Sequence, residues 1–347
     1  MKAALVERPG VLTVRDVPAP EVDDYGVRCE LLYGATCTGT DQHILYGRMP
    51  WPIHYPVILG HESIGRAVEL GPRVRYFRLG DLITRVGAPP DPDGTYDVAW
   101  GGFAEFGLAR DHRAMREDGL PAQAWHGHRV NQVLPAEFDP AAATMIITWR
   151  ETFSYLTRMG VERGAAVLVI GSGGNGLSFI AHASNIGAGA VAMIGSPGRL
   201  AAGRAVGASA GFDYHVPDEE LVASLAGSFP EGFDFIIDAV GKAGQIDRVL
   251  PLLKPGGVIG LYGIDDFEAN AIHPRRAKGS FTYYNGGYDE EETHEQIVAW
   301  VADGKLDAST WLDGAPAFAL EEIADAFQSL RERRMVKALI RLTCSGR

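Results

Sequence analysis

A buried strand that runs directly into a glycine-rich turn limits the possible folds of this chain more than any other feature. The apolar run 167–170 predicts a parallel strand. Gly171, Gly173 and Gly176 follow at the spacing G-x-G-x-x-G, and a helical run comes next. The first glycine permits the tight turn, the second lets backbone approach a pyrophosphate, and the third lets helix and strand pack closely. This order predicts a dinucleotide-binding unit with phosphate at the helix N-terminus.

Size and charge restrict the class of protein further. The chain has 347 residues, enough for two domains, and a net charge of −12, which argues against nucleic acid or an anionic membrane as its main partner. The cysteines Cys29, Cys37 and Cys344 make no disulfide framework, which favours a reducing cytoplasm. We expect no secretory signal at the N-terminus and no membrane-spanning run.

Two patterns of predicted elements divide the chain. Short strands over 12–17, 27–33, 63–70 and 80–86 indicate a barrel-like β domain, followed by a loop over 87–102 and a helix over 141–158. From 166 to about 285, strands alternate with helices, which predicts a doubly wound parallel sheet and an α/β fold. Its expected strands are 167–170, 190–194, 233–238 and 257–262, and its expected helices are 177–185, 200–206, 219–226 and 244–253.

The last part of the chain is expected to rejoin the first domain. An amphipathic helix over 320–331 and a closing strand over 336–342 follow the α/β unit. A strand in this place suggests that the chain returns to pack on the β domain. Residues 344–347 are expected to be a frayed tail.

Two stretches of the first domain carry a family resemblance. The run Gly60-His61-Glu62 and the segment from Cys37 through Gly39-Thr40-Asp41 to His43 resemble motifs of the medium-chain dehydrogenase/reductase superfamily, in particular its zinc-type alcohol, polyol and glucose dehydrogenases. With the glycine fingerprint in place, the resemblance covers essentially the whole chain. It implies a GroES-like catalytic domain (1–150 and 290–347), a Rossmann NAD(P)-binding domain (151–289), an active site between them, and a homodimer or homotetramer.

The resemblance also assigns roles to individual residues. Cys37 and His61 match the ligands of a catalytic zinc, and Glu62 matches the acid beside them, which can orient or replace a ligand. Thr40 matches the hydroxyl of a proton relay and His43 its outer imidazole. In this chemistry a Lewis acid stabilises the alkoxide that develops as the substrate carbon gives its hydride to the nicotinamide.

The chain departs from the family pattern in three places. Residues 87–110 contain no cysteine, so we predict no structural zinc. The usual cysteine position falls on Thr38, and Cys37 stands one residue earlier. The usual third zinc ligand falls on Ile147; Glu151, one helical turn further along the same face, and Glu62 are the two candidates to replace it.

The second Rossmann strand favours NADP over NAD. It ends in Gly195 and Ser196 with Arg199 nearby, and no acid is present to bind a ribose 2′-hydroxyl. A guanidinium can pair with a 2′-phosphate, although Arg199 can also simply begin the next helix, and NAD stays possible. Further cofactor contacts are expected at the fingerprint turn and at the ends of later strands: Gly174, Asn175, Ala239, Val240, Leu261 and Gly263.

The substrate is predicted from the composition of the expected pocket. The candidates mix hydrogen-bonding and aromatic groups, which favours a small polyhydroxylated alcohol such as a sugar, polyol or cyclitol; they are Gln42, Trp51, His54, Tyr55, Trp100, Trp149, Arg150, Tyr284 and Asn285. Two alternatives remain open at this point. One is a zinc-free quinone or alkene reductase of the same superfamily, and the other is a non-catalytic nucleotide-binding protein.

Overall fold

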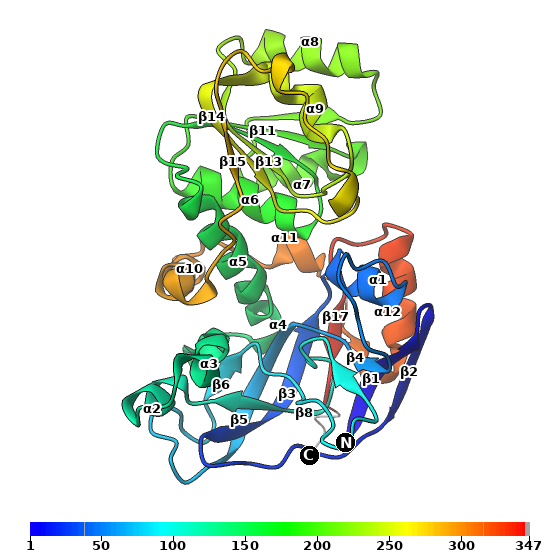
Figure 1. Ribbon diagram of the computed structural model, residues 1–347, viewed down its shortest axis with the longest axis vertical. Coiled ribbons are helices and arrows are strands. Elements are labelled where there is room, and N and C mark those ends of the chain that lie inside the picture. The colour runs from blue at the N-terminus through cyan, green and yellow to red at the C-terminus, as the bar shows by residue number, and fades with distance from the viewer. Residues whose placement is uncertain (38, 315, 344–347) are drawn as a thin grey trace. The chain divides into compact units, whose positions relative to one another are not determined.

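The computed structural model describes residues 1–37, 39–314 and 316–343, so the tail expected at 344–347 lies outside the described residues. The chain divides into two compact units (Figure 1). One consists of Met1–Thr148 with Glu290–Arg347, and the other of Trp149–Asp289. We call them the catalytic unit and the coenzyme unit. No helix among the described residues is long and apolar enough to cross a bilayer.

Two sheets build the catalytic unit. The smaller has the order β2-β1-β4-β7, and the larger has the order β16-β17-β3-β5-β6-β9 with β8 paired to β3. The predicted loop over 87–102 contains the two-residue strand β7. The strand bounds are β1 Lys2–Arg8, β2 Val11–Asp16, β3 Gly26–Ala35, β4 Val57–Ile58, β5 Glu62–Leu70, β6 Leu82–Thr84, β7 Asp97–Val98, β8 Phe106–Arg110, β9 Val133–Leu134, β16 Phe318–Ala319 and β17 Leu339–Arg341.

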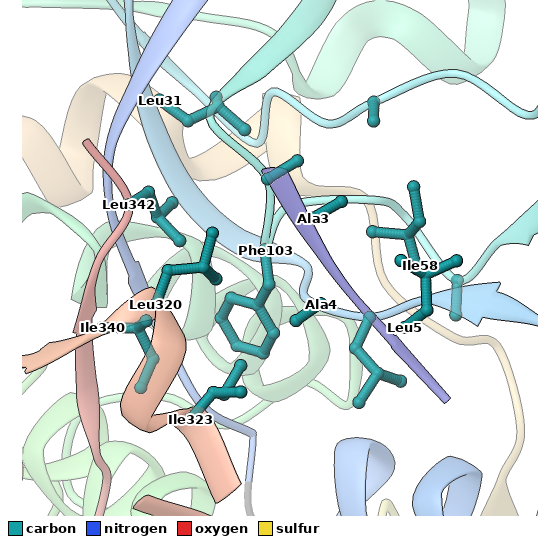
Figure 2. Packing of buried hydrophobic residues seen from close by; sticks show 14 of the residues in the cluster. Ala3, Ala4, Leu5, Leu31, Ile58, Phe103, Leu320, Ile323, Ile340 and Leu342 are labelled. Atoms are coloured by element: carbon teal, nitrogen blue, oxygen red, sulfur yellow. The ribbon is translucent and has the colours of Figure 1, made fainter. Parts of the chain in front are cut away.

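The core of the catalytic unit forms around Phe103, which is fully buried (Figure 2). Two glycines make room for its ring and backbone. A Cβ on Gly34 would lie 2.9 Å from Phe103 Cε1, and one on Gly60 would lie 2.7 Å from Phe103 N. Gly60 also has a φ of +95°, which side chains rarely adopt. This packing fixes the backbone immediately before His61.

The end of the chain returns to the catalytic unit, as the sequence predicts. Strand β17 pairs antiparallel with β3, with Ile340 opposite Gly34. Helix α12 buries Ile323, Ala326, Phe327 and Leu330, which recur at the spacing of one helix face. The predicted strand over 336–342 is shorter than expected, and the predicted helix begins with a 3₁₀ turn, Leu320–Glu322.

The coenzyme unit contains a six-stranded, fully parallel sheet of order β12-β11-β10-β13-β14-β15. The strand order reverses between β10 and β13, which is the doubly wound topology that the alternating pattern predicts. Two of its strands, β12 and β15, were not among the expected ones. The bounds are β10 Ala166–Ile170, β11 Ala190–Gly195, β12 Ala210–Asp213, β13 Phe233–Asp238, β14 Leu253–Leu261 and β15 Thr282–Tyr284.

Both faces of this sheet are covered, which explains the uninterrupted apolar run of β10. Val167 and Val169 pack with Phe179 and Ile180 of α6 on one face. Leu168 and Ile170 pack in a second cluster, which includes buried side chains of α8 and α9. Alternate residues of a strand point to opposite faces, so a strand buried on both sides needs apolar residues at every position. The run is therefore typical of a central parallel strand.

Helices connect these strands and close both units. The predicted helix over 141–158 is divided into α4 and α5 at Thr144, and the predicted helix over 244–253 ends early in a 3₁₀ turn. The helix bounds are α1 Thr40–Leu45, α2 His112–Glu117, α3 Ala122–Trp125, α4 Pro140–Ala143, α5 Met145–Arg158, α6 Gly174–Asn185, α7 Leu200–Ala205, α8 Asp218–Ser228, α9 Gln245–Val249, α10 His294–Ala302, α11 Ser309–Leu312 and α12 Ile323–Arg331.

Candidate functional site

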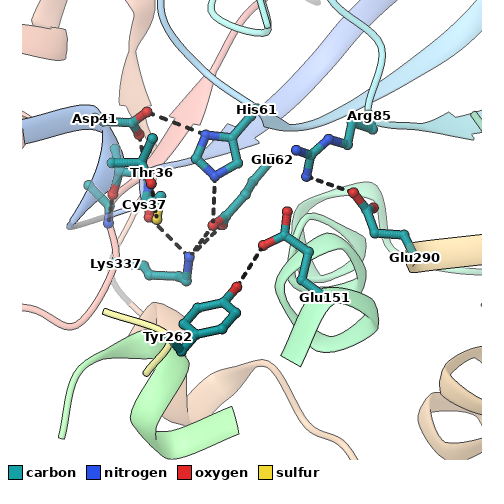
Figure 3. A network of polar contacts seen from close by, with 12 residues as sticks. Thr36, Cys37, Asp41, His61, Glu62, Arg85, Glu151, Tyr262, Glu290 and Lys337 are labelled. Atoms are coloured by element: carbon teal, nitrogen blue, oxygen red, sulfur yellow. Dashed lines mark hydrogen bonds and ion pairs between the residues drawn. The ribbon is translucent and has the colours of Figure 1, made fainter. Parts of the chain in front are cut away.

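Three potential metal ligands meet in the catalytic unit (Figure 3). Cys37, His61 and Glu62 are buried, and one ligand atom from each lies within 4.8 Å of the others. Cys37 follows β3, and Glu62 begins β5; the two strands pair with Ala35 opposite Glu62. The strand pairing thus brings together two motifs that are more than twenty residues apart in the sequence.

This group has the chemistry of a zinc site. Thiolate, imidazole and carboxylate are the ligands that zinc takes in proteins. Asp41, which is fully buried, lies behind the histidine, with Oδ1 3.6 Å from His61 Nδ1. Its other oxygen accepts a hydrogen bond from the Cys37 backbone N–H at 2.8 Å. A carboxylate in this position orients a metal-binding imidazole, so the residues present fit the metal.

Negative charge around the histidine attracts a cation. Burial lowers the pKa of His61, but Asp41 and Cys37 raise it by more, and the net pKa lies well above its usual value. The group therefore favours positive charge at its centre. A metal ion binding there would have to displace any proton held on the imidazole.

A buried lysine supplies positive charge beside the same group. Lys337 Nζ donates hydrogen bonds to Glu62 Oε1 at 2.6 Å, to Glu62 Oε2 at 2.5 Å and to the Thr36 carbonyl at 3.1 Å. Lys337 and Glu62 side chains are each 1% exposed. Burial lowers the lysine pKa, but the charges of Glu62 and Cys37 more than offset this, so it lies above its usual value.

Sequence reasoning did not single out this lysine or assign a role to Asp41. The signal for Lys337 was present as one charged residue inside the apolar run 336–340, within the predicted closing strand. A charge at such a position is rarely buried without a partner. The Thr36 N–H donates to the Ala338 carbonyl at 3.0 Å. This hydrogen bond holds the segment that contains Lys337 next to Cys37.

The two proposed relay residues lie on the short helix α1. Thr40 begins the helix, and its Oγ1 lies 3.6 Å from Cys37 Sγ. His43 follows three residues later and is largely buried, with Nδ1 2.8 Å from the Gly39 carbonyl. Helix α1 thus carries Thr40 at the metal-ligand group and His43 one turn further along.

Glu151 belongs to the coenzyme unit, where two tyrosines bind its carboxylate. The hydroxyl of Tyr262 donates to Oε2 at 3.1 Å and that of Tyr288 donates to Oε1 at 3.2 Å. Glu151 is 6% exposed, so these contacts satisfy a buried charge. The three-ligand group described above does not contain Glu151, whose role as a metal ligand stays a prediction.

The glycine fingerprint has the close contacts that its spacing predicts. Gly171 directly follows β10 and has a φ of +118°. A Cβ on Gly176 would lie 2.2 Å from the Gly171 carbonyl oxygen, so only glycine fits there. Gly173 precedes α6, and a Cβ there would meet nothing within 4 Å, so the turn is open on that side. Gly174 and Asn175 form the first turn of the helix.

The end of β11 contacts this turn through Ser172. The Ser196 backbone N–H donates to Ser172 Oγ at 3.1 Å, and Arg199 Nη1 donates to the Ser172 carbonyl at 3.5 Å. A Cβ on Gly195 would lie 2.6 Å from Ser172 Cβ. The structure therefore places Ser196 and Arg199 beside the fingerprint, with Ser172 as a neighbour that sequence reasoning did not name.

The remaining predicted cofactor residues lie at the ends of β13 and β14 or directly after them. Ala239 and Val240 come after Asp238, whose carboxylate accepts hydrogen bonds from the N–H groups of Val240 and Gly241 at 2.8 and 2.9 Å. Burial raises the pKa of Asp238 to about 6. Leu261 ends β14, and a Cβ on Gly263 would lie 2.0 Å from the Val240 carbonyl carbon. The two turns are thus in contact at the carboxyl edge of the sheet.

The aromatic candidates for substrate binding differ in exposure. Trp149 and Arg150 are 1% and 0% exposed and belong to the interior. Trp100 is 43% exposed, and its ring centroid lies 4.9 Å from that of His61. Among these candidates, Trp100 combines exposure with contact to the metal-ligand group.

Comparisons with known proteins match both units. Residues 29–120 match the family model "Alcohol dehydrogenase GroES-like domain", and residues 206–336 match "Zinc-binding dehydrogenase". NADP-dependent isopropanol dehydrogenase of Thermoanaerobacter brockii is 32% identical over 71% of this chain and 70% of its own length. L-threonine 3-dehydrogenase of Anaeromyxobacter sp. is 27% identical over 95% of both chains.

A solved structure supports the same fold. Alcohol dehydrogenase from Thermus sp. ATN1 superposes with a TM-score of 0.78 at 21% identity, covering 99% of this chain and 100% of that chain. Together with the family models, this likeness confirms the predicted fold class, a GroES-like domain joined to a Rossmann-type parallel sheet.

Proposed function

The chain belongs to the medium-chain dehydrogenase/reductase superfamily as an oxidoreductase of the NAD(P)-dependent alcohol dehydrogenase type, and we propose that it oxidises a secondary alcohol of a polyhydroxylated substrate to a ketone or lactone. NADP and one catalytic zinc are the cofactors that family membership supports. We propose that Cys37, His61 and Glu62 hold the zinc. The observation that carries this proposal is the buried convergence of these three side chains.

Each residue then has a defined task. Bound zinc would supply Lewis acidity at the substrate oxygen. Cys37 Sγ and a ring nitrogen of His61 would hold the metal, and Asp41 would fix the orientation of the imidazole. Thr40 Oγ1 would accept the proton of the substrate hydroxyl while its own hydroxyl proton is given up toward His43, which would release a proton to solvent. Bound NADP⁺ would supply the nicotinamide that accepts a hydride from the carbinol carbon.

The test is the metal content of purified, unchelated protein, together with a screen for NADP reduction by sugar alcohols, cyclitols and simple secondary alcohols. About one mole of zinc per chain with turnover of polyols supports the proposal. A zinc content near zero contradicts it. In that case the Lys337 ammonium alone balances Glu62, and the zinc-free reductase becomes the function to test.

The preference for NADP gives a specific prediction. Replacing Arg199 by alanine is expected to lower kcat/KM for NADP by about 10- to 100-fold, because a charge-assisted contact to the 2′-phosphate contributes about 1.5–3 kcal/mol. The value for NAD, which lacks that phosphate, should change by less than about twofold on the same reasoning. Steady-state kinetics with both coenzymes measures this difference.

The matched control is Arg204→Ala, an exposed arginine in the last turn of α7. It removes the same charge from the same segment and should leave the NADP/NAD ratio unchanged. Equal losses with both coenzymes in the Arg199→Ala variant would contradict a phosphate contact.

We also propose the domain boundaries, the cellular compartment, the type of substrate and the assembly of the protein. The catalytic domain comprises 1–150 with 290–347, and 151–289 form the NADP-binding domain. Cysteine usage supports the cytoplasm, since the described cysteines, Cys29 and Cys37, are free and buried. The partner is a small-molecule alcohol or carbonyl compound, and a homodimer or homotetramer is the expected assembly.

A further inference from the structure

Arg85 has a backbone conformation that an arginine rarely adopts. It directly follows β6, and its φ of +57° lies in the left-handed region, where a side chain costs free energy. Two hydrogen bonds hold this conformation. The Arg85 N–H donates to the Ser63 carbonyl at 2.8 Å, and Asn131 Nδ2 donates to the Arg85 carbonyl at 3.0 Å. Strain of this kind persists only where the surrounding structure enforces it, and it is concentrated at functional sites.

The guanidinium of Arg85 forms a buried ion pair with Glu290 (Figure 3). Nη1 lies 3.0 Å from Glu290 Oε1, and the two side chains are 8% and 2% exposed. Glu290 is the first residue of the segment by which the chain returns to the catalytic unit. The next residue, Glu291, forms a more exposed ion pair with Arg129. The buried, charge-assisted contact to Glu290 restricts where the guanidinium can lie.

The same guanidinium lies over the indole of Trp100. Arg85 Cζ is 5.8 Å from the ring centroid, which is within the range of a cation–π contact. The indole in turn contacts the imidazole of His61, with ring centroids 4.9 Å apart and the rings tilted by 53°. The Trp100 backbone is also enclosed, since a Cβ on Gly87 would lie 1.7 Å from the Trp100 carbonyl oxygen. Arg85, Trp100 and His61 are therefore in consecutive contact.

The indole restricts a motion of the imidazole that Asp41 leaves open. Asp41 Oδ1 lies 3.6 Å from His61 Nδ1, so it acts on one edge of the ring. A contact at a single nitrogen does not fix the tilt of the ring plane, whereas an aromatic neighbour packed against the ring does. The tilt matters for a metal ligand, because the lone pair of a ring nitrogen lies in the plane of the ring.

We propose that Arg85 is a positioning residue of the metal-ligand group: held by Glu290, it fixes the indole of Trp100, and the indole fixes the plane of the His61 imidazole. This inference rests on the proposed role of His61 as a zinc ligand. A ring that tilts away from the metal direction binds the ion less tightly. Neighbours that orient a metal-binding histidine contribute about 10- to 100-fold to metal affinity.

The experiment measures zinc affinity by competition with a chelator, and the visible absorption of the Co²⁺-substituted protein. The proteins compared are the wild type, Trp100→Asn and the double variant Arg85→Asn/Glu290→Gln. Asparagine tolerates positive φ, and the double variant removes both charges of the buried pair, so neither variant adds backbone strain or an unpaired charge. We expect the zinc dissociation constant to rise about 10- to 100-fold in each, and the cobalt absorption bands to shift.

Two further proteins make the test specific. Combining Trp100→Asn with the double variant should add less than about twofold to the larger of the two effects, because all three substitutions interrupt one series of contacts. The matched control is Arg129→Gln/Glu291→Gln, which removes the neighbouring ion pair of the same returning segment. It should leave the zinc affinity within twofold of the wild type and the cobalt spectrum unchanged.

The outcomes separate this inference from the proposed function. Zinc affinity within twofold of the wild type in Arg85→Asn/Glu290→Gln overturns the inference. Effects that multiply in the combined variant, or an equal loss in the control, also overturn it. If the wild type binds neither zinc nor cobalt, the proposed zinc site fails, and crystal structures of the metal-free proteins decide. A His61 ring that turns in Arg85→Asn/Glu290→Gln then sustains the inference, and an unchanged ring overturns it.

Discussion

Replacing Lys337 by methionine is expected to destabilise the metal-free protein by about 3–5 kcal/mol, because the substitution leaves the Glu62 carboxylate buried without its partner. The three hydrogen bonds of the ammonium would be lost together. Chemical denaturation in the presence of a chelator measures the free energy of unfolding. Added zinc should raise the melting temperature of this variant more than that of the wild type, since a metal ion can replace the lost positive charge.

Two further variants test whether the loss of stability in Lys337→Met comes from the unpaired buried charge of Glu62. Lys254→Met breaks an ion pair of similar geometry with Asp234 that is partly exposed, and should cost only about 0–1 kcal/mol. Combining Lys337→Met with Glu62→Gln removes both charges and should restore part of the lost stability. A Lys337→Met protein as stable as the Lys254→Met protein would show that the carboxylate finds another partner or takes up a proton.

The coenzyme unit was the most predictable part of the fold because its signals are local. The strand, the three glycines and the following helix are contiguous, and β13 has the predicted bounds 233–238. Strands β12 and β15 were missed for a physical reason. Both lie at the edges of the sheet, are short and have at most intermediate burial along most of their length, so they lack the apolar run that identifies a central strand.

The candidate site was less predictable from the sequence, because its contacts are not local. The motifs identified Cys37, His61 and Glu62, but the side chains that hold these residues come from distant segments. Lys337 lies 275 residues from Glu62 in the sequence and is brought there by the pairing of β17 with β3. Local patterns cannot encode a contact made by tertiary pairing. The position of Cys37, one residue earlier than the usual cysteine, also depends on a distant segment. The neighbouring Thr36 N–H donates to the Ala338 carbonyl, next to β17.

Cys37→Ala and His61→Ala are each expected to lower bound zinc from about one mole per chain to below a tenth, and kcat by at least a thousandfold, if the proposed site is correct. Loss of one protein ligand from a three-ligand site removes most of its affinity, and a Lewis acid at a developing alkoxide contributes several kcal/mol. Elemental analysis after dialysis measures the first effect, and initial rates at saturating coenzyme measure the second.

Cys29 provides the matched control for the thiol. It is fully buried in β3 and lies outside the metal-ligand group, so Cys29→Ala should keep its zinc and lose only packing energy. Glu62→Gln separates ligation from charge, because the amide keeps the shape of the side chain but binds zinc poorly. Zinc retained by both Cys37→Ala and His61→Ala would place the metal elsewhere, and full activity without zinc would remove the Lewis acid from the reaction and leave Thr40 and His43 to act on the substrate directly.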